Sequence, residues 1–192
     1  YLIAFRRHIE ELIQQGALSI YTGGFIHIHK QFLTIGINGL LEAAEFLGYT
    51  ASNNPDYIAW IARQLAIIKE ENQLATQRTG YKFNTECVPA ENLGVKNATW
   101  DKQDGLWVPR DCYNSYFYPQ EADHINLVDK FILHGKAIIQ YCDGGSANHV
   151  NLAEYPSAEA YYKLIVLAAK TGCNFWCTNI YVTYCEDCEH ID

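Results

Sequence analysis

The residues best suited to chemistry are a carboxylate near the end of a predicted strand and the helix that follows it. Residues 81–88 are predicted to form the strand, and Pro89 suits the first position of a helix. Because side chains alternate between the two faces of a strand, Asn84 and Glu86 should project together from the face opposite the core. A carboxylate placed there can act as a general acid or base.

The start of this predicted helix offers a place for an anion. Val88 precedes a proline, which favours extended geometry. The N–H groups of Ala90, Glu91 and Asn92 would then lack partners within the helix, and with the helix dipole they favour a phosphate. Glu91 would repel that phosphate unless it folds back as a cap or helps to hold a cation. The plain alternative is an ordinary strand–helix junction with a solvated Glu86.

A pair of cysteines has the spacing of zinc ligands. Cys185 and Cys188 form a CxxC motif, which supplies two of the four ligands of a structural zinc site. His190 is a third candidate by spacing alone. Cys173 and Cys177 could complete the site, but the strand predicted between the pairs would hold them roughly 25 to 30 Å apart at about 3.3 Å per residue. The sequence therefore predicts half of a zinc site.

Other sulfur-containing and polar residues are better explained by packing or by turns. His27 and His29 share one face of a predicted strand, where we expect surface polar residues rather than metal ligands. The run 143–146 (DGGS) is expected to be a turn, and the aromatic segment 113–118 is expected to pack rather than to stack a base. Five cysteines are expected to be small buried side chains: Cys87, Cys112, Cys142, Cys173 and Cys177.

Hydrophobic periodicity and turn residues divide the chain into alternating helices and strands. Helices are predicted at 1–15, after a turn at 34–39, at 54–76, from 89 onward, at 126–134 and at 156–170. Strands are predicted at 20–28, interrupted by the glycines at 23 and 24, and at 81–88, 147–152 and 175–184. This alternation predicts an α/β fold with a largely parallel sheet, and residues 1–192 are interpreted as a single domain.

Composition limits the possible partners and compartments. The 192 residues are 49% hydrophobic, which is enough for one core, and the net charge of −8 argues against nucleic acid and anionic membranes. No stretch has transmembrane length or a signal-peptide pattern. Seven cysteines without a signal peptide favour a reducing cytoplasm. The chain has no methionine and opens directly in a helical pattern, so we expect a fragment of a longer protein.

Five blocks, in order along almost the whole chain, resemble the anaerobic (class III) ribonucleoside-triphosphate reductases. The blocks are TIGINGLLEAAEFLG (34–48), FNTECVPAENLG (83–94), YNSYFY (113–118), DGGS (143–146) and CEDCEHID (185–192). The resemblance implies a glycyl radical enzyme with a ten-stranded α/β barrel. It also implies that this chain is the C-terminal half of that barrel, without the radical loop. The family's ATP-binding cone, thiyl-forming cysteine and radical glycine have no match here.

The resemblance also implies roles for the candidate residues. In the family reaction a thiyl radical removes the 3′ hydrogen of the ribose, and the 2′-hydroxyl leaves as water, which gives a 2′-deoxyribonucleotide for DNA synthesis. Glu86 matches a glutamate that accepts the 3′-OH proton in one subgroup. The substrate phosphates would be held by the segment Val88, Pro89, Ala90, Glu91 and Asn92, with Asn84 beside it. That subgroup is reduced by a thioredoxin-type dithiol, whereas others use formate.

The same resemblance implies cofactors and partners of the full-length parent. They are a glycyl radical, a radical-SAM activating enzyme, the remainder of the reductase chain and a second copy in a homodimer. A structural zinc beside the radical loop is implied, and its match carries over only to Cys185 and Cys188. The isolated chain is expected to be inactive. The alternative hypothesis is a non-catalytic zinc-knuckle module that uses the aromatic segment to bind a partner.

Overall fold

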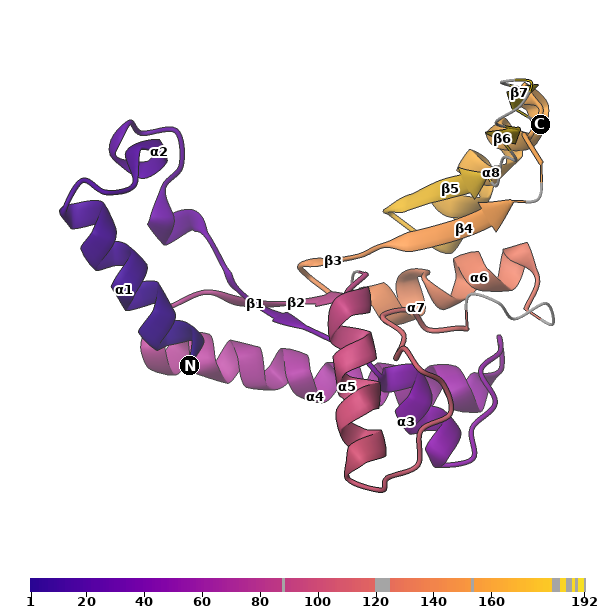
Figure 1. The fold of residues 1–192 in the computed structure, drawn as a ribbon, viewed down its shortest axis with the longest axis horizontal. Coiled ribbons are helices and arrows are strands. Elements are labelled where there is room, and N and C mark those ends of the chain that lie inside the picture. The colour runs from indigo at the N-terminus through magenta and orange to yellow at the C-terminus, as the bar shows by residue number, and fades with distance from the viewer. Residues whose placement is uncertain are drawn as a thin grey trace.

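The structure, a computed structural model, describes residues 1–87, 89–119, 125–152, 154–180, 184–185, 188 and 190–191. Its helices are α1 (Leu2–Gln14), α2 (Ser19–Thr22), the 3₁₀-helix η1 (Ile28–Lys30), α3 (Leu40–Phe46), α4 (Pro55–Thr79), α5 (Glu91–Gln103), α6 (Leu127–Leu133), α7 (Lys136–Ile139) and α8 (Ala158–Thr171). Its strands are β1 (Leu33–Gly36), β2 (Phe83–Cys87), β3 (Gly145–Ser146), β4 (Asn148–Leu152), β5 (Trp176–Ile180), β6 (Tyr184–Cys185) and β7 (His190–Ile191). Helices and strands are mixed along the chain, which confirms the predicted α/β character (Figure 1).

Two small parallel sheets, β1–β2–β3 and β4–β5, carry the candidate site. β2 pairs in parallel with β1 and with β3, and β4 pairs in parallel with β5. Only Ala147 separates β3 from β4. Its N–H donates to the carbonyl of Cys87, and the next N–H, of Asn148, donates to the carbonyl of Phe175. The stretch 145–152 is therefore shared between two neighbours, first β2 and then β5. A closed ten-stranded barrel is not seen in the described residues.

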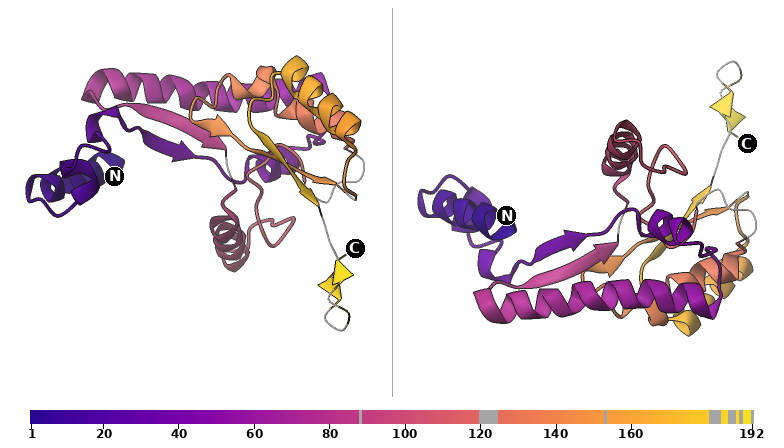
Figure 2. Two further views of the ribbon diagram at one scale, coloured as in Figure 1. Left: turned by 90° about the horizontal axis from the view of Figure 1, so that it is seen from above. Right: turned by 90° about the horizontal axis from the view of Figure 1, so that it is seen from below.

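Helices cover one face of this sheet. Figure 2 shows α4, α6 and α8 on one side of the strands, whereas α5 and the antiparallel hairpin of β6 and β7 project from the other side. On the covered side α4 packs along β2, and α6 contacts both α8 and β4. The opposite face is left without a helical layer, and the polar side chains described below project from it.

The helices begin and end where their sequences favour it. Asn54 accepts a hydrogen bond from the N–H of Tyr57 at 2.8 Å, and Pro55 opens the first turn of α4. Gly80, with φ of 76°, ends the same helix in the left-handed region. Side-chain oxygens cap α6 and α8 in the same way. These helices confirm the predictions at 54–76, 126–134 and 156–170, with α4 running three residues further.

Two hydrophobic clusters form the core. The larger is built from α3, α4, β2, α7 and residues 117–118, and the smaller from α6, β4, α8 and residue 173. Helix α6 joins them, because Leu133 belongs to the first cluster and Phe131 to the second. Thr85 and Cys87 are fully buried, whereas Lys82 is exposed and Glu86 half-buried. The predicted core face of β2 is thus confirmed.

Two segments in the first third of the chain differ from prediction, whereas α1 confirms the helix predicted at 1–15. The strand predicted at 20–28 is wrong, because α2 and η1 occupy parts of that segment. Gly23 donates its N–H to the carbonyl of Ser19 at 2.8 Å, and Gly24 has φ of 77°, so the backbone turns where a strand would have to extend. His27 and His29 consequently do not share a strand face; both are exposed, with rings 5.6 Å apart. The turn predicted at 34–39 is also partly wrong, since residues 34–36 pair with β2.

Within the described residues, every helix is too short or too polar to cross a lipid bilayer.

Candidate functional site

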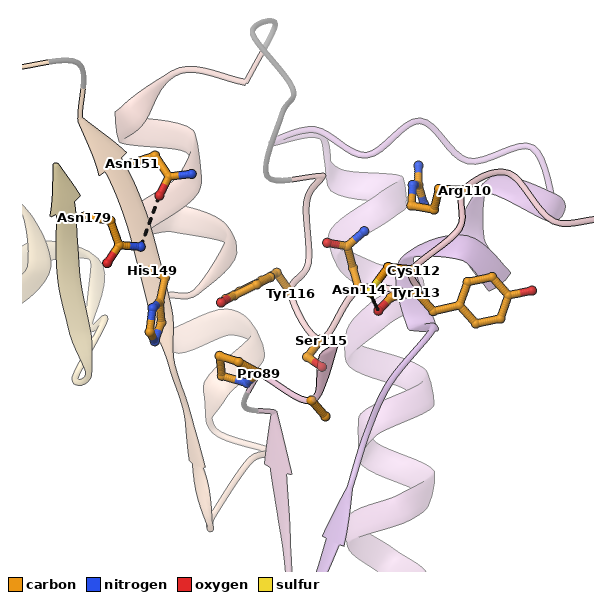
Figure 3. A pocket seen from close by; sticks show the side chains of 11 residues that line it. Pro89, Arg110, Cys112, Tyr113, Asn114, Ser115, Tyr116, His149, Asn151 and Asn179 are labelled. Atoms are coloured by element: carbon orange, nitrogen blue, oxygen red, sulfur yellow. Dashed lines mark hydrogen bonds between the residues drawn. The ribbon is translucent and has the colours of Figure 1, made fainter. Parts of the chain in front are cut away.

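A cavity of about 510 Å³ lies beyond the carboxyl end of β2 and against the uncovered face of β4 and β5. It is lined by residues from β4, β5, the β2–α5 connection and the loop that follows α5 (Figure 3). These residues are Pro89, Ala90, Arg110, Cys112, Tyr113, Asn114, Ser115, Tyr116, His149, Asn151 and Asn179. Ligands of open α/β sheets bind at this end of the strands. The cavity is therefore the candidate site.

The strand wall of the cavity carries polar side chains in register. His149 and Asn151 alternate along β4 with the buried residues Asn148 and Val150. Asn151 pairs with Asn179 of β5, whose side-chain Nδ2 donates to Asn151 Oδ1 at 3.1 Å. Figure 3 shows the two amides and the imidazole side by side along the strands. This wall offers both donors and acceptors to a ligand.

The loop wall is held by hydrogen bonds from Asn38, a residue that follows β1 and is distant from the loop in sequence. Asn38 Nδ2 donates to the carbonyl of Tyr113 at 2.9 Å and to Ser115 Oγ at 3.1 Å. These bonds hold the loop so that Tyr116 faces His149 across the cavity, with ring centroids 6.0 Å apart (Figure 3). Phe117 is fully buried behind the loop. The expectation that segment 113–118 packs is therefore confirmed for Phe117, whereas Tyr116 lines the cavity.

Arg110 is the cationic side chain of the lining, and its charge is already balanced. Its guanidinium donates to Glu42 at 2.5 Å and to Glu45 at 2.8 Å, both on α3. Burial alone would lower the pKa of Arg110, but the hydrogen bonds and negative charges of the two glutamates raise it overall. Glu42 also accepts from the backbone N–H of Asn114 at 3.1 Å. Arg110 thus links α3 to the loop through these two ion pairs. Because its charge is balanced by the two glutamates, an anion in the cavity would need hydrogen-bond donors from other residues.

The start of α5 supplies such donors. Ala90 is the N-cap residue, and it has no side-chain oxygen to bond the N–H groups of the first turn. The prediction that Pro89 is the first helical residue is wrong, because Ala90 is not helical (φ −141°, ψ 52°) and the helix begins at Glu91. Three residues, 88–90, separate β2 from this helix, which points away from the strands (Figure 2). Pro89 and Ala90 line the cavity as a result.

Close packing holds this helix start against the loop. Tyr113 donates its N–H to the carbonyl of Gly94 at 3.2 Å. A Cβ atom on Gly94 would lie 2.4 Å from the carbonyl oxygen of Tyr113 and 2.9 Å from Cys112 Sγ. Only glycine allows so close an approach. The first turn of α5 and the loop wall therefore form one unit.

Glu86 shares the face of the cavity but does not line it. It pairs with Gly145, and residues paired in parallel strands point to the same face. Because side chains alternate along a strand, His149, four residues after Gly145, also points to that face. His149 lies four residues further along, a distance of about 13 Å. Asn84 packs beside the 143–144 turn, with its Oδ1 buried and unpartnered among the described residues. Asn92 is exposed on α5 outside the lining, and Val88 lies outside the described residues.

A buried histidine supports the loop wall from behind. His134 is fully buried, with Nδ1 3.0 Å from Ser146 Oγ, and its ring contacts those of Tyr116 and Phe117. Burial, and to a lesser extent the charge of His149, lowers its pKa to about 3. His134 is therefore neutral at physiological pH and acts as a packing group.

The described residues do not assemble a metal centre. No group of three or more His, Cys, Asp or Glu side chains among them could hold a metal ion. Cys188 is exposed, and the side chain of Cys185 lies outside the described residues, so the zinc prediction stays a prediction.

Burial is confirmed for Cys87, Cys142 and Cys173, but the expectation is wrong for Cys112 and Cys177, which are only partly buried. Both of these lie near the uncovered face, Cys112 in the cavity lining itself.

Sequence reasoning missed the strand wall. His149, Asn151 and Asn179 were not singled out, although polar residues at alternate positions of the predicted strand 147–152 were a usable signal. Asn179, a single Asn in the predicted aromatic and β-branched strand 175–184, was a weaker signal. Neither signal says which strands are neighbours.

Comparisons with known proteins identify a family and similar folds. The family model for anaerobic ribonucleoside-triphosphate reductase matches residues 1–192. The crystal structure of the anaerobic ribonucleotide reductase from Thermotoga maritima in complex with dATP and CTP is 26% identical, with a TM-score of 0.86, over 100% of this chain and 32% of that chain. The same enzyme with MES in the active site is 28% identical, with a TM-score of 0.86, over 100% and 33%. A further anaerobic ribonucleotide reductase is 27% identical, with a TM-score of 0.87, over 100% and 31%.

The chain therefore spans about a third of the length of these solved reductases. Curated proteins gave no match.

Proposed function

This chain belongs to the anaerobic ribonucleoside-triphosphate reductase family, and we propose that it forms the C-terminal half of the catalytic barrel of such a reductase. The whole enzyme would reduce ribonucleoside triphosphates to 2′-deoxyribonucleotides by glycyl and thiyl radical chemistry. The main supporting observation is the cavity between the carboxyl end of β2 and the face of β4 and β5, in a chain whose whole length matches the reductase family. Alone, this chain would be inactive.

Phosphate binding is proposed for the start of α5. Its uncapped N–H groups adjoin Pro89 and Ala90 in the cavity, and a helix N-terminus favours negative charge. The net charge of −8 and the balanced charge of Arg110 leave these amides as the local attraction for a triphosphate. The segment 88–92 would therefore hold the phosphates.

Proton transfer is proposed for Glu86. Its position near the end of β2, on the face of the cavity, would let its carboxylate accept the 3′-OH proton of a ribose that lies between the strand end and the strand wall. Accepting that proton helps the 2′-hydroxyl to leave as water. Asn84, two residues earlier on the same face, would contact the substrate or orient Glu86.

The remaining parts of the reaction are proposed for other components. A radical-SAM activating enzyme would generate the glycyl radical, the rest of the reductase would carry it and the thiyl cysteine, and a thioredoxin-type dithiol or formate would supply the electrons. The enzyme would be a cytoplasmic homodimer. Zinc at Cys185 and Cys188 is proposed on spacing alone, because the described residues complete no ligand set. No step of the reaction is assigned to it.

The test is Glu86→Gln in the complete reductase, activated anaerobically. The amide keeps the shape of the side chain but cannot take up the proton, so turnover should fall by about 10²–10⁴-fold while nucleotide affinity stays unchanged. Glu70→Gln, at an exposed position on α4, is the matched control and should keep full turnover. Equal turnover in the two variants would remove Glu86 from the mechanism and would favour a non-catalytic binding module. Absence of a glycyl radical signal in the activated parent would overturn the reductase assignment.

A further inference from the structure

A second cavity, of about 330 Å³, lies between α3, the end of α5 and the loop that follows it. Its walls include the side chains of Phe46, Leu106, Trp107 and Tyr113, and we call it the aromatic cavity. The rings of Phe46 and Trp107 have centroids 5.8 Å apart. The exposed fractions of Phe46, Leu106 and Trp107 are 67%, 59% and 49%. Its rim is therefore open to solvent and unusually rich in apolar side chains.

Glu42 lines this cavity with an unsatisfied carboxylate oxygen. The side chain is almost entirely buried, with 4% exposed. Its Oε1 accepts hydrogen bonds from Arg110 and Asn114. Its Oε2 is buried and has no hydrogen-bond partner among the described residues. A buried polar atom without a partner is costly, and because this oxygen has almost no accessible surface, a donor in the cavity would reach it only if the neighbouring side chains moved.

Asp101 gives the cavity a second carboxylate. Its Oδ2 accepts from the hydroxyl of Tyr113 at 2.7 Å, and a carboxylate has further acceptor sites. Burial, the hydrogen bond to Asp101 and the negative charges nearby raise the pKa of Tyr113 to about 12, so Tyr113 stays a neutral donor. The two charged residues that line the cavity, Glu42 and Asp101, are both acidic, whereas Arg110, which pairs with Glu42 and Glu45, lines the other cavity. The cavity therefore favours a cationic ligand over an anionic one.

We propose that the aromatic cavity binds an organic cation, a guanidinium or ammonium group carried on an apolar stem. The cation would lie over the rings of Trp107 and Phe46, where their π-faces attract positive charge. Its N–H groups would donate to the carboxylate of Asp101 and reach toward Glu42. The stem would contact Leu106. The cation is either a free small molecule or the side chain of an arginine or lysine on a protein. This binding needs no nucleotide turnover, so it does not rest on the proposed function.

The test is a titration of the ¹⁵N-labelled protein with butylguanidinium and with its neutral isostere butylurea. The backbone amide signals of Gly39 and Leu106, which line the cavity, report binding in the unsubstituted protein and in every variant. Butylguanidinium should give a saturable shift, with butylurea binding at least about tenfold more weakly. Asp101→Asn keeps an acceptor for Tyr113 but loses the charge, so it should weaken the cation about tenfold and leave butylurea unchanged. Glu70→Gln removes an equal charge from exposed α4 and should bind as the parent does.

A capped tripeptide with arginine between two leucines, compared with its citrulline counterpart, separates the two sources. Tighter binding of the arginine peptide than of butylguanidinium assigns the cavity to a side chain of a protein partner, and equal or weaker binding assigns it to a small cation. Trp107→Leu, at the exposed rim, is a second variant that should lose cation binding while its circular dichroism stays that of the parent. The proposal is overturned if charged and neutral probes shift Gly39 and Leu106 alike. It is equally overturned if Asp101→Asn and Trp107→Leu both bind the cation as tightly as the parent.

Discussion

His134 is a single residue whose burial should be visible as pH dependence. Its pKa lies near 3 in the folded protein because it is buried, and near 6.5 in the unfolded chain. Between these values the unfolded state binds the proton and the folded state does not, so stability falls as the pH falls. From pH 6.5 to 4.5 this should remove about 2 kcal/mol from the free energy of unfolding. Urea unfolding of the unsubstituted protein and of His134→Phe at both pH values measures this loss. The variant lacks the buried imidazole, so its free energy of unfolding should fall by about 2 kcal/mol less than that of the unsubstituted protein.

The comparison needs a control for the change of ring. His29→Phe makes the same replacement at an exposed position, where water surrounds the side chain in both states, and it should keep the pH dependence of the parent. If His134→Phe does not fold, the imidazole proton signals of His134 in the parent serve instead. They should not move between pH 7.5 and 5. A normal titration of that signal would contradict the buried, neutral state.

At the scale of elements, the first turn of α5 is the proposed anion site, and it can be tested one N–H at a time. Glu91→Pro and Glu91→Ala both remove the glutamate side chain, but only proline removes the backbone N–H at the first helical position, where its ring is tolerated. Hydrogen bonds to charged groups contribute about 1.5–3 kcal/mol. In the complete reductase, Glu91→Pro should therefore bind ribonucleoside triphosphates about tenfold or more weakly than Glu91→Ala.

Nucleosides without phosphate separate this effect from general damage to the site. Both variants should bind a ribonucleoside equally well, because the loss concerns the phosphates alone. Equal triphosphate affinity in the proline and alanine variants would show that this N–H does not contact the ligand, and would move the phosphates elsewhere.

Elements that carry their own boundary signals were predictable from the sequence. Helix α4 begins with Asn54 and Pro55 and ends at Gly80, and each of these residues acts through local geometry. The failure at 20–28 has the opposite origin. β-Branched and aromatic residues there favoured a strand, but local hydrogen bonds around Gly23 and Gly24 wind the backbone into α2 and its turn.

The candidate site was predictable only where it is continuous in sequence. Glu86 and the β2–α5 connection lie within a few residues of each other, so alternation and the proline could indicate them. Asn38 and Tyr113 are joined across 75 residues. Asn151 and Asn179 meet only because β4 pairs with β5. Contacts of this kind depend on which elements become neighbours, and one sequence without its fold does not specify that.

At the scale of the whole molecule, the two hydrophobic clusters should differ in their response to a core mutation. Phe131 is fully buried in the smaller cluster, with its ring edge-on to Trp176 at 5.3 Å. Phe131→Ala should cost about 3–5 kcal/mol because it leaves a cavity that cannot fully collapse. Amide hydrogen exchange should show the loss of protection concentrated in β4, β5 and α8, with less in α4.

The control for Phe131→Ala is the same substitution at an exposed phenylalanine. Phe25 is 83% exposed, so Phe25→Ala should change protection nowhere beyond its own turn. Uniform loss of protection in Phe131→Ala, equal in α4 and β5, would mean that the two clusters unfold as one cooperative unit.

The shared stretch 145–152 bears on how the protein is made. The parallel pairs place β1, β2, the stretch 145–152 and β5 side by side in the order in which a ribosome releases them. Each new strand can therefore join the free edge left by the one before, without being inserted between two strands already paired. At about 5–20 residues per second, β2 would have several seconds to dock on β1 before residue 145 emerges. Vectorial synthesis thus favours the native neighbours of each strand, and among the described residues β5 is the last strand to join and has one partner, β4.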